Sequence, residues 1–406
     1  MDLSLYNAGQ LVTMNKADED DLGIIEDGAF IVRDGKFAWV GKTRELKEMG
    51  VHTDMRIDAE GLLVTPGFID PHTHLVFAGS REDELDRKIR GESYIEILKS
   101  GGGINRTIAF TRKAEELELL ESSLSRLKQL IRQGVTTVEV KTGYCQDVQG
   151  EMKMLRVASQ LSARSGIDVV RTFLGLHSIP PEFNSSEDYA DFVIREMLPA
   201  VAKIKPDFAD CFCEEGLFSS SVCKKYLESS RLLGLKLKVH ADEFSYSHGA
   251  ELAAEVGCTS ADHLENSSTE GLSMMASKNV SAVLLPGTAF YSRIKQPDFK
   301  KVRESGCSFA LGTDLSPNSW IESPQLVMAI ACVQMGMKIS EAISAFTIGA
   351  AKALSLGDRG MISEGKIADF VIHRVRNYMF LPYRIGGNYI HSVFKKSNLI
   401  YSSKEA

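Results

Sequence analysis

The chain has 406 residues, of which 44% are hydrophobic and 25% charged, and its net charge is −7. This composition is typical of a globular protein with a large core, and it excludes a disordered or fibrous chain. The negative charge gives no reason to expect nucleic acid as a partner, and no apolar segment is long enough to cross a membrane.

The seven cysteines are an odd number, are scattered along the chain and form no Cys-x-x-Cys pair. This pattern favours reduced thiols inside a cell over a disulfide framework. The first residues also lack a basic stretch followed by an apolar one, which is the pattern of a secretion signal. We therefore expect a cytoplasmic location.

The two ends of the chain both contain short runs that are typical of β-strands. Residues 1–64 contain short apolar runs separated by turn signals, and we expect strands at 4–6, 9–14, 28–33, 36–40 and 55–58. Residues 365–373 and 392–401 resume this pattern. The ends are therefore predicted to pair into one small β-sandwich domain with two parts, residues 1–64 and 361–406.

The segment 66–74 reads Pro-Gly-Phe-Ile-Asp-Pro-His-Thr-His. Residues two apart in a strand point to the same side, so His72 and His74 can share one metal ion. The apolar residues at 62–64 and 68–69 are typical of a buried parallel strand that leads to this pair. The motif therefore predicts a metal site at the end of a strand.

Strand-length apolar runs then alternate with longer amphipathic stretches. The later runs lie at 134–141, 168–175, 208–213, 235–240, 259–263, 280–285 and 307–312, which with the run leading to His74 makes eight. Helices are expected at 115–133, 150–165 and 326–334. Eight strands alternating with helices over residues 65–360 predict an α/β fold, a (β/α)₈ barrel. A doubly wound open sheet is the alternative, but no glycine-rich phosphate fingerprint favours it.

The polar residues that could perform chemistry fall where these strands end, which is where barrel enzymes carry their active sites. They are His72, His74, His177, His240, Glu243, His263 and Asp314. Nitrogen and oxygen donors without thiolate suit a divalent zinc or iron ion, and both metals stay open at this point. We expect His72, His74, His240 and Asp314 to hold one such ion in each subunit.

His263 and Glu243 are candidates for moving protons, and Asp314 could share the role of base. Glu214 and Lys141 also lie at strand ends, and we predict that neither is a ligand. A two-metal site that includes Glu214 stays open as the alternative.

Several further strings make the chain recognisable. It resembles the amidohydrolase superfamily in 66–74, in His240, His263 and Asp314, and in Gly365-Lys-Ile-Ala-Asp369. Within that superfamily it is similar to the imidazolonepropionase family. That likeness rests on Leu75-Val-Phe-Ala-Gly-Ser-Arg81, Gly101-Gly-Gly-Ile104, Glu139-Val-Lys-Thr-Gly-Tyr144, Phe173-Leu-Gly-Leu-His-Ser-Ile-Pro-Pro-Glu182, Lys238-Val-His-Ala-Asp-Glu243, Ser260-Ala-Asp-His-Leu264 and Leu284-Leu-Pro-Gly-Thr-Ala-Phe-Tyr291.

The resemblance implies a small-molecule substrate, 4-imidazolone-5-propanoate, whose ring is opened by water to N-formimidoyl-L-glutamate in histidine degradation. It implies that His263 activates the water and that the substrate is contacted by Arg81, Tyr94, Tyr144, His177, Glu243, Ser316, Asn318 and Ser319. An arginine suits the carboxylate tail of such a substrate. By analogy with the superfamily, a homodimer is expected.

One segment departs from the family pattern. After the aspartate the family usually reads Asp-x-Asn-x-Gly followed by Ser or Thr, whereas this chain reads Asp314-Leu-Ser-Pro-Asn-Ser319. A serine hydroxyl is shorter than a carboxamide, so the contact at Ser316 must be reshaped or bridged by water. The departure could also indicate a shifted substrate. A deaminase of a cytosine-like or guanine-like ring, a different cyclic-amide hydrolase and a non-catalytic binding protein are the alternatives.

Overall fold

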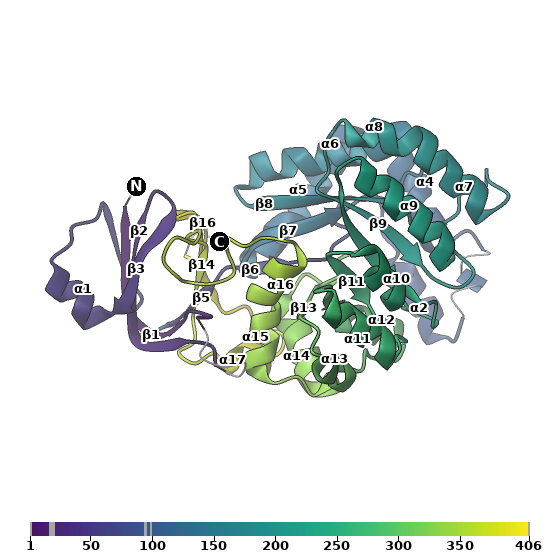
Figure 1. The fold of residues 1–406 in the computed structure, drawn as a ribbon. Coiled ribbons are helices and arrows are strands. Elements are labelled where there is room, and N and C mark those ends of the chain that lie inside the picture. Colours follow the sequence, from purple (N-terminus) through teal and green to yellow (C-terminus); the bar gives the residue numbers. More distant parts are fainter. Residues whose placement is uncertain (1, 16–20, 93–95, 98–99, 405–406) are drawn as a thin grey trace.

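The structure is a computed structural model that describes residues 2–15, 21–92, 96–97 and 100–404. Two bodies lie side by side in Figure 1, a barrel with helices around it and a smaller β-domain that contains both chain ends. The predicted fold class, a (β/α)₈ barrel with a discontinuous β-domain, is confirmed. The domain limits at residues 64 and 360 stay a prediction.

Eight parallel strands form the barrel in chain order, each paired with the next. They are β6 (Phe68–Asp70), β7 (Val135–Lys141), β8 (Asp168–Leu176), β9 (Phe208–Cys213), β10 (Lys236–Ala241), β11 (Ser260–His263), β12 (Ser281–Leu284) and β13 (Phe309–Leu311). The seven apolar runs predicted after residue 74 correspond to β7 through β13.

The barrel closes through the residues that follow its first and last strands. Thr73 and Leu315 form a parallel bridge, and the Thr313 hydroxyl donates to Asp70 at 2.6 Å. The backbone of His74 donates to Leu315 at 2.9 Å, and that of Asp314 donates to His72 at 3.0 Å. The segment with the two predicted histidine ligands is therefore joined directly to the segment with the predicted aspartate ligand.

Helices follow most of the strands. Those of the barrel are α2 (Glu82–Ile89), α4 (Gly103–Lys113), α5 (Glu116–Arg132), α6 (Val148–Ser165), α7 (Ser186–Phe192), α8 (Leu198–Ala202), α9 (Ser220–Leu232), α10 (Gly249–Val256), α11 (Thr269–Ser277), α12 (Pro286–Ser292), α13 (Phe299–Ser305), α14 (Pro324–Met335), α15 (Ile339–Ala345) and α16 (Ile348–Ala353). A π-helical turn at Val193–Met197 joins α7 to α8. The predicted helices correspond to α5, α6 and α14. In the described part of the chain, no helix is long and apolar enough to cross a membrane.

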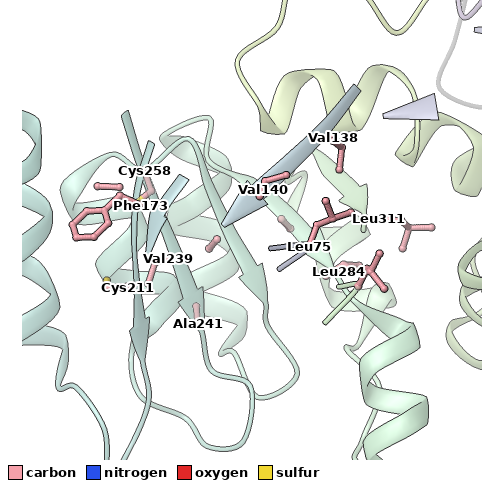
Figure 2. Packing of buried hydrophobic residues seen from close by; sticks show 14 of the residues in the cluster. Leu75, Val138, Val140, Phe173, Cys211, Val239, Ala241, Cys258, Leu284 and Leu311 are labelled. Atoms are coloured by element: carbon pink, nitrogen blue, oxygen red, sulfur yellow. The ribbon is translucent and has the colours of Figure 1, made fainter. Parts of the chain in front are cut away.

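The barrel strands alternate between apolar and polar residues, although both sets are buried. On β7, Val138 and Val140 belong to the main hydrophobic core, while Glu139 and Lys141 form an ion pair with each other. Figure 2 shows the apolar set from several strands, including Phe173, Cys211 and Val239. Because neighbouring residues of a strand face opposite sides, this alternation packs the helices on one side and leaves a polar barrel interior on the other.

The small β-domain is a mixed sheet in the order β16-β15-β14-β5-β1-β2-β3, with β4 paired to β1. Its strands are β1 (Leu3–Val12), β2 (Ile24–Arg33), β3 (Lys36–Lys42), β4 (Met55–Asp58), β5 (Leu63–Pro66), β14 (Phe370–His373), β15 (Ile390–Lys395) and β16 (Asn398–Ser402). Helices α1 (Thr43–Met49) and α17 (Phe380–Tyr383) complete the described elements. Phe30 packs edge-on against Phe37 and Phe370 in its core, which joins the two ends of the chain.

Three local expectations differ from the structure. The strands predicted at 4–6 and 9–14 are one strand, β1, and the strand predicted at 392–401 is a hairpin of β15 and β16. The apolar run predicted to lead into the barrel is divided at Gly67. The Gly67 amide donates to Asp369 of the small domain, whereas the next amide, of Phe68, donates to Gly134 of the barrel. A side chain at position 67 would meet Thr136, since an ideal Cβ there lies 2.3 Å from its Oγ1.

Candidate active site

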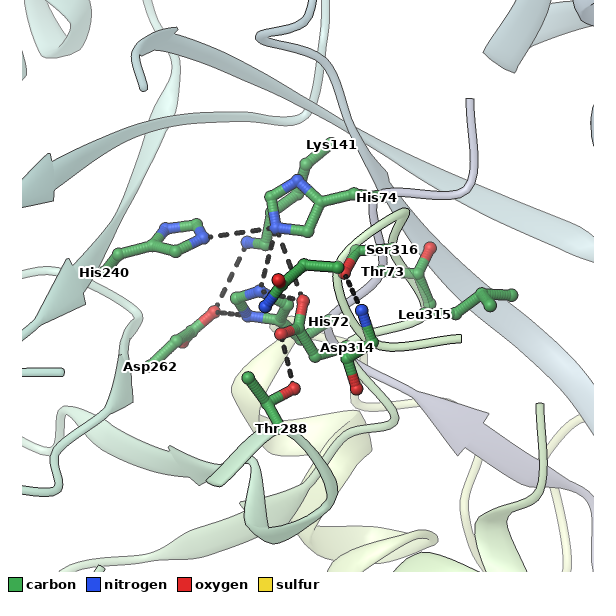
Figure 3. A network of polar contacts seen from close by, with 12 residues as sticks. His72, Thr73, His74, Lys141, His240, Asp262, Thr288, Asp314, Leu315 and Ser316 are labelled. Atoms are coloured by element: carbon green, nitrogen blue, oxygen red, sulfur yellow. Dashed lines mark hydrogen bonds and ion pairs between the residues drawn. The ribbon is translucent and has the colours of Figure 1, made fainter. Parts of the chain in front are cut away.

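Three of the four predicted ligands, His72, His74 and His240, bring their ring nitrogens together where β6 and β10 end, and Asp314, after β13, lies beside two of them (Figure 3). The Nε2 atom of His74 lies 3.3 Å from His72 Nε2 and 3.4 Å from His240 Nε2. Oδ1 of Asp314 lies 3.5 Å from the Nε2 atoms of both His72 and His74. All four side chains are buried, and within the described part of the chain Asp314 Oδ1 has no hydrogen-bond partner.

This arrangement fits a divalent metal ion. Donors about 2.0–2.1 Å from an ion, arranged tetrahedrally around it, lie about 3.3–3.4 Å from each other. Burial lowers the pKa of His72 and of His74, so both imidazoles are neutral and keep a lone pair for a cation. An unpaired carboxylate oxygen beside neutral imidazole nitrogens would otherwise be unfavourable in a buried place.

Two carboxylates lie next to the Nδ1 atoms of His72 and His240. Nδ1 of His72 lies 2.7 Å from Asp262 Oδ2, and Nδ1 of His240 lies 3.1 Å from Asp210 Oδ2. A carboxylate at Nδ1 keeps the proton on that nitrogen and leaves Nε2 free to bind a metal. Asp262 thus sets which nitrogen His72 presents, and Asp210 lies close enough to His240 to favour the same form.

Two buried lysines hold these carboxylates. Lys141 Nζ lies 2.8 Å from Asp210 and 3.3 Å from Asp262, and Lys238 Nζ lies 3.0 Å from Glu139 and 3.2 Å from Asp262. Burial disfavours the charged form of Lys141, but the carboxylates of Asp210, Glu139 and Asp262 outweigh it and raise the pKa. A second group, formed by His72, Glu139 and Asp262, also has the spacing of a cation site. The ammonium groups of Lys141 and Lys238 already lie beside its carboxylates, so a metal ion is not needed there.

The Glu214 carboxylate is held by donors of the segment that follows β10. It accepts a hydrogen bond from the Phe244 amide at 3.0 Å and another from the Ser245 hydroxyl. Among the described residues, the groups spaced to hold a metal do not include Glu214. The expected role of Glu214 as a non-ligand stays a prediction.

His263 and Glu243 face each other beside the metal-binding group. His263 Nε2 lies 3.6 Å from Glu243 Oε2, and its Nδ1 lies 3.8 Å from Glu265 Oε2. Burial alone would lower the pKa of His263, but the two carboxylates outweigh it and raise that pKa. Burial also raises the pKa of Glu243. A buried imidazole and carboxyl in this relation can hold one proton between them.

The backbone near these groups is unusual. His263 has φ of 81° and Asp314 has φ of 48°, in the left-handed region that side chains with a Cβ rarely adopt. Such conformations are found where the surrounding structure enforces them, often at active sites.

One cavity collects most of the predicted substrate contacts. It is lined by His74, Arg81, Ile104, Tyr144, His177, Phe212, His240, Glu243, Phe244, His263, Thr288, Asp314, Ser316 and Asn318. The rings of His177 and His74 stack with centroids 5.1 Å apart, and Tyr144 lies 5.1 Å from His177. Burial lowers the pKa of His177 to about 3, so this imidazole is neutral.

Ser319 and Tyr94 are the two remaining predicted substrate contacts. Ser319 is fully buried and not among the residues that line the cavity, and its amide donates to the Ser316 hydroxyl at 3.1 Å. Tyr94 lies outside the described residues.

Sequence reasoning assigned no role to several residues that complete the site. Thr288 donates to Asp314 at 2.6 Å, Glu265 faces His263, and Asp210 lies behind His240. Thr288 and Asp262 do lie within the strings that carry the family resemblance. The sequence pattern did contain a signal for Asp210. It is a charged residue between apolar ones in a predicted barrel strand, and such a residue points into the barrel interior.

Comparisons with known proteins agree with this geometry. The Amidohydrolase family model matches residues 63–395. An imidazolonepropionase of Geobacillus sp. (strain WCH70) is 43% identical over 416 aligned residues, which cover 99% of this chain and 98% of that protein. The imidazolonepropionase of Parabacteroides distasonis is 42% identical, with 97% and 98% covered.

Solved structures share the fold at low identity. A zinc-bound adenosine deaminase from Xanthomonas campestris has a TM-score of 0.76 at 16% identity, and covers 98% of this chain and 92% of its own. The guanine deaminase of E. coli has a TM-score of 0.74 at 18% identity, with 98% and 99% covered. At these identities the likeness concerns the fold alone. The family match and the near full-length relatives show that this chain belongs to the amidohydrolase family and, within it, to the imidazolonepropionases.

Proposed function

We propose that this protein hydrolyses the cyclic amide bond of 4-imidazolone-5-propanoate and forms N-formimidoyl-L-glutamate, a step of histidine degradation. One observation carries the proposal. The convergent nitrogens of His72, His74 and His240 lie at a cavity that His74, His240 and Asp314 line together with Arg81, the predicted partner of a carboxylate. The names of the relatives support the same reaction.

We propose that His72, His74, His240 and Asp314 hold one divalent ion, zinc or iron, in each subunit. The spacing of their donor atoms and the unpaired Asp314 Oδ1 support a single site. When bound, such an ion would polarise the ring carbonyl and make water more acidic.

The chain itself supplies proton transfer. Ring opening joins the oxygen of water to the carbonyl carbon, breaks the bond from that carbon to the ring nitrogen, and moves one proton from the water to that nitrogen. With the shared proton on Glu243, His263 is neutral and accepts the proton of the attacking water, and Glu243, 3.6 Å from it, delivers its own proton to the leaving nitrogen. Asp314 can share the role of base.

The remaining cavity residues would bind and orient the substrate. Tyr144 and His177 lie beside His74, where a planar ring can pack against them. Arg81 would hold the propionate, and Ser316 and Asn318 lie on the adjoining wall. Ser319 would act through Ser316, to whose hydroxyl its amide donates. Tyr94 stays a proposed contact from the family resemblance.

Metal analysis of the purified protein, coupled to turnover of freshly generated imidazolone propionate, tests this function. Cytosine and guanine serve as control substrates, because a neutral base has no carboxylate for Arg81. We expect about one equivalent of zinc or iron, turnover of the acid only, and loss of both metal and turnover in His72→Ala. Turnover of a control base alone, or full activity without metal, would contradict the proposal.

We also propose a cytoplasmic homodimer. The seven cysteines are all free, and six are buried, which suits a reducing compartment. The dimer rests on analogy with the superfamily. Light scattering of the purified protein measures its mass directly, and a monomer at micromolar concentration would contradict it.

A further inference from the structure

Two cations meet one carbonyl oxygen on the wall of the cavity. Nη2 of Arg81 donates to Asn318 Oδ1 at 3.3 Å, and Nζ of Lys88, from α2, donates to the same oxygen at 2.8 Å. Arg81 and Asn318 both line the cavity. Sequence reasoning assigned no role to Lys88.

The charge of Arg81 is already offset within the protein. Its Nε and Nη2 atoms donate to Glu84 Oε2 at 2.9 and 2.8 Å, and both side chains are buried. Glu84 is itself held in place, because the Gly103 amide donates to its other oxygen at 2.8 Å. The pair of Arg81 and Glu84 therefore brings directional N–H donors to a substrate carboxylate but almost no net positive charge.

Lys88 lies farther from a carboxylate, and Glu84 acts on it only beyond ion-pair distance. Among the described residues, no carboxylate lies within ion-pair distance of its Nζ, which instead lies over the Tyr291 ring at 5.4 Å from the centroid. Burial and the nearby Arg81 lower the pKa of Lys88, and the carboxylate of Glu84 offsets this only in part. The Lys88 ammonium is partly removed from water and lies beside a like charge. Binding of a substrate carboxylate next to it is therefore favourable.

We propose that Lys88 is the second cation of the carboxylate subsite, and that Asn318 Oδ1 holds the place of one substrate carboxylate oxygen until the substrate arrives. This inference rests on the proposed function, since it concerns the propionate end of the same substrate. The carboxylate then receives N–H donors from Arg81 and net charge from Lys88. The Asn318 carboxamide must turn aside to admit it.

This arrangement gives the departure at position 318 a physical meaning. Asn318 Oδ1 is a neutral acceptor, so it satisfies both cations in the empty cavity without the charge that a substrate brings. A carboxylate competes well with a neutral oxygen for the same donors, because its negative charge adds Coulomb attraction to both cations. A neutral ring without a tail gains nothing from displacing it.

Steady-state kinetics of Lys88→Met tests the inference, with Lys88→Arg as the conservative variant and Arg90→Met as the matched control. Arg90 follows the same helix and is exposed, so its loss removes an equal charge away from the cavity. We expect Lys88→Met to raise KM about 10- to 100-fold with kcat within about twofold, since a hydrogen-bonded charge contributes about that much to binding. Lys88→Arg should restore most of the affinity, and Arg90→Met should leave KM unchanged.

Two further measurements separate the possible explanations. Calorimetric binding of N-formimidoyl-L-glutamate should weaken in Lys88→Met by the same factor, without any need for turnover. Asn318→Ala should lower KM, because it removes the oxygen that competes with the substrate carboxylate for both cations. A tenfold rise in KM for Asn318→Ala would show that Asn318 binds the substrate directly and would overturn the place-holding role. An unchanged KM and unchanged product binding in Lys88→Met would overturn the role of Lys88, whereas an inactive wild-type protein would contradict the proposed function itself.

Discussion

One hydroxyl orients the carboxylate that follows the last barrel strand. Thr288 donates to Asp314 Oδ2 at 2.6 Å, and this leaves Oδ1 beside His72 and His74. Thr288 lies on α12, far from the histidine ligands in sequence, and it is buried. Partners of metal ligands typically contribute 10- to 100-fold to metal affinity.

Thr288→Val should therefore weaken metal binding about 10-fold or more while keeping the fold, because valine has nearly the same shape and lacks only the donor. Competition with a chromophoric chelator measures the metal dissociation constant. Thr107→Val is the matched control, since the buried Thr107 hydroxyl has no hydrogen-bond partner among the residues that the structure describes. Equal metal affinity in the two variants would show that Asp314 needs no orienting partner.

Lys141 is the residue whose loss should damage stability most. It lies fully buried between Asp210, Glu139 and Asp262. Removing one partner of a buried ion pair leaves uncompensated charge and typically destabilises by about 3–5 kcal/mol. We expect Lys141→Met to lose about that much in urea unfolding at pH 7, whereas Lys128→Met, at an exposed position, should change stability by less than about 0.5 kcal/mol. A loss below about 1 kcal/mol for Lys141→Met would mean that Lys238 alone compensates the carboxylates.

At the scale of elements, strand alternation explains how the barrel encloses its polar network. On β10, Lys238 and His240 join the ion pairs of the interior, while Val239 and Ala241 belong to the core. On β11, Asp262 forms an ion pair in the barrel interior, whereas Ala261 belongs to the hydrophobic core. The same period of two that packs helices on one side therefore lines the interior with charge.

The division between β5 and β6 depends on Gly67. A Cβ there would lie 2.3 Å from Oγ1 and 2.5 Å from Cγ2 of Thr136. Gly67→Ala should therefore destabilise the protein by about 1–3 kcal/mol, the usual effect of overpacking. Thermal unfolding measures this, with Gly357→Ala as the control because nothing lies within 4 Å of a Cβ at position 357.

Thr136→Ala removes the two nearest atoms from this contact, so it should recover part of the loss when combined with Gly67→Ala. Additive effects of the two substitutions would contradict the steric explanation.

At the scale of the whole molecule, a buried histidine lies where the two bodies join. His373 of β14 is fully buried, and its Nε2 lies 2.8 Å from the Thr65 hydroxyl of β5. Its ring lies 5.8 Å from that of Phe68, on the first barrel strand. Burial lowers the pKa of His373 to about 3.

This histidine should make stability depend on pH. Its folded pKa lies below the unfolded value of about 6.5, so the unfolded chain binds the proton first and stability falls as the pH drops from about 6.5 toward 3. His373→Phe cannot bind that proton. Between pH 7 and pH 5 we expect the wild type to lose up to about 2 kcal/mol more than His373→Phe, measured by urea unfolding at each pH. Parallel pH profiles for the two proteins would contradict this account.

The sequence by itself determined the alternation of strands and helices, the pairing of the two chain ends, and the placing of histidines and Asp314 at strand ends. These follow from patterns of period 2 and 3.6 and from motifs a few residues long, which depend only on neighbours in the chain. They sufficed for the fold class and for the family.

Only the tertiary structure decided which atoms meet. Lys141 reaches Asp210 and Asp262, which lie 69 and 121 residues further along the chain. Lys88 reaches Asn318 across 230 residues. The division at Gly67 was likewise invisible, because one continuous apolar run feeds two different sheets. Contacts of this kind depend on barrel closure, which brings the ends of all eight strands to one place, so no local pattern could specify them.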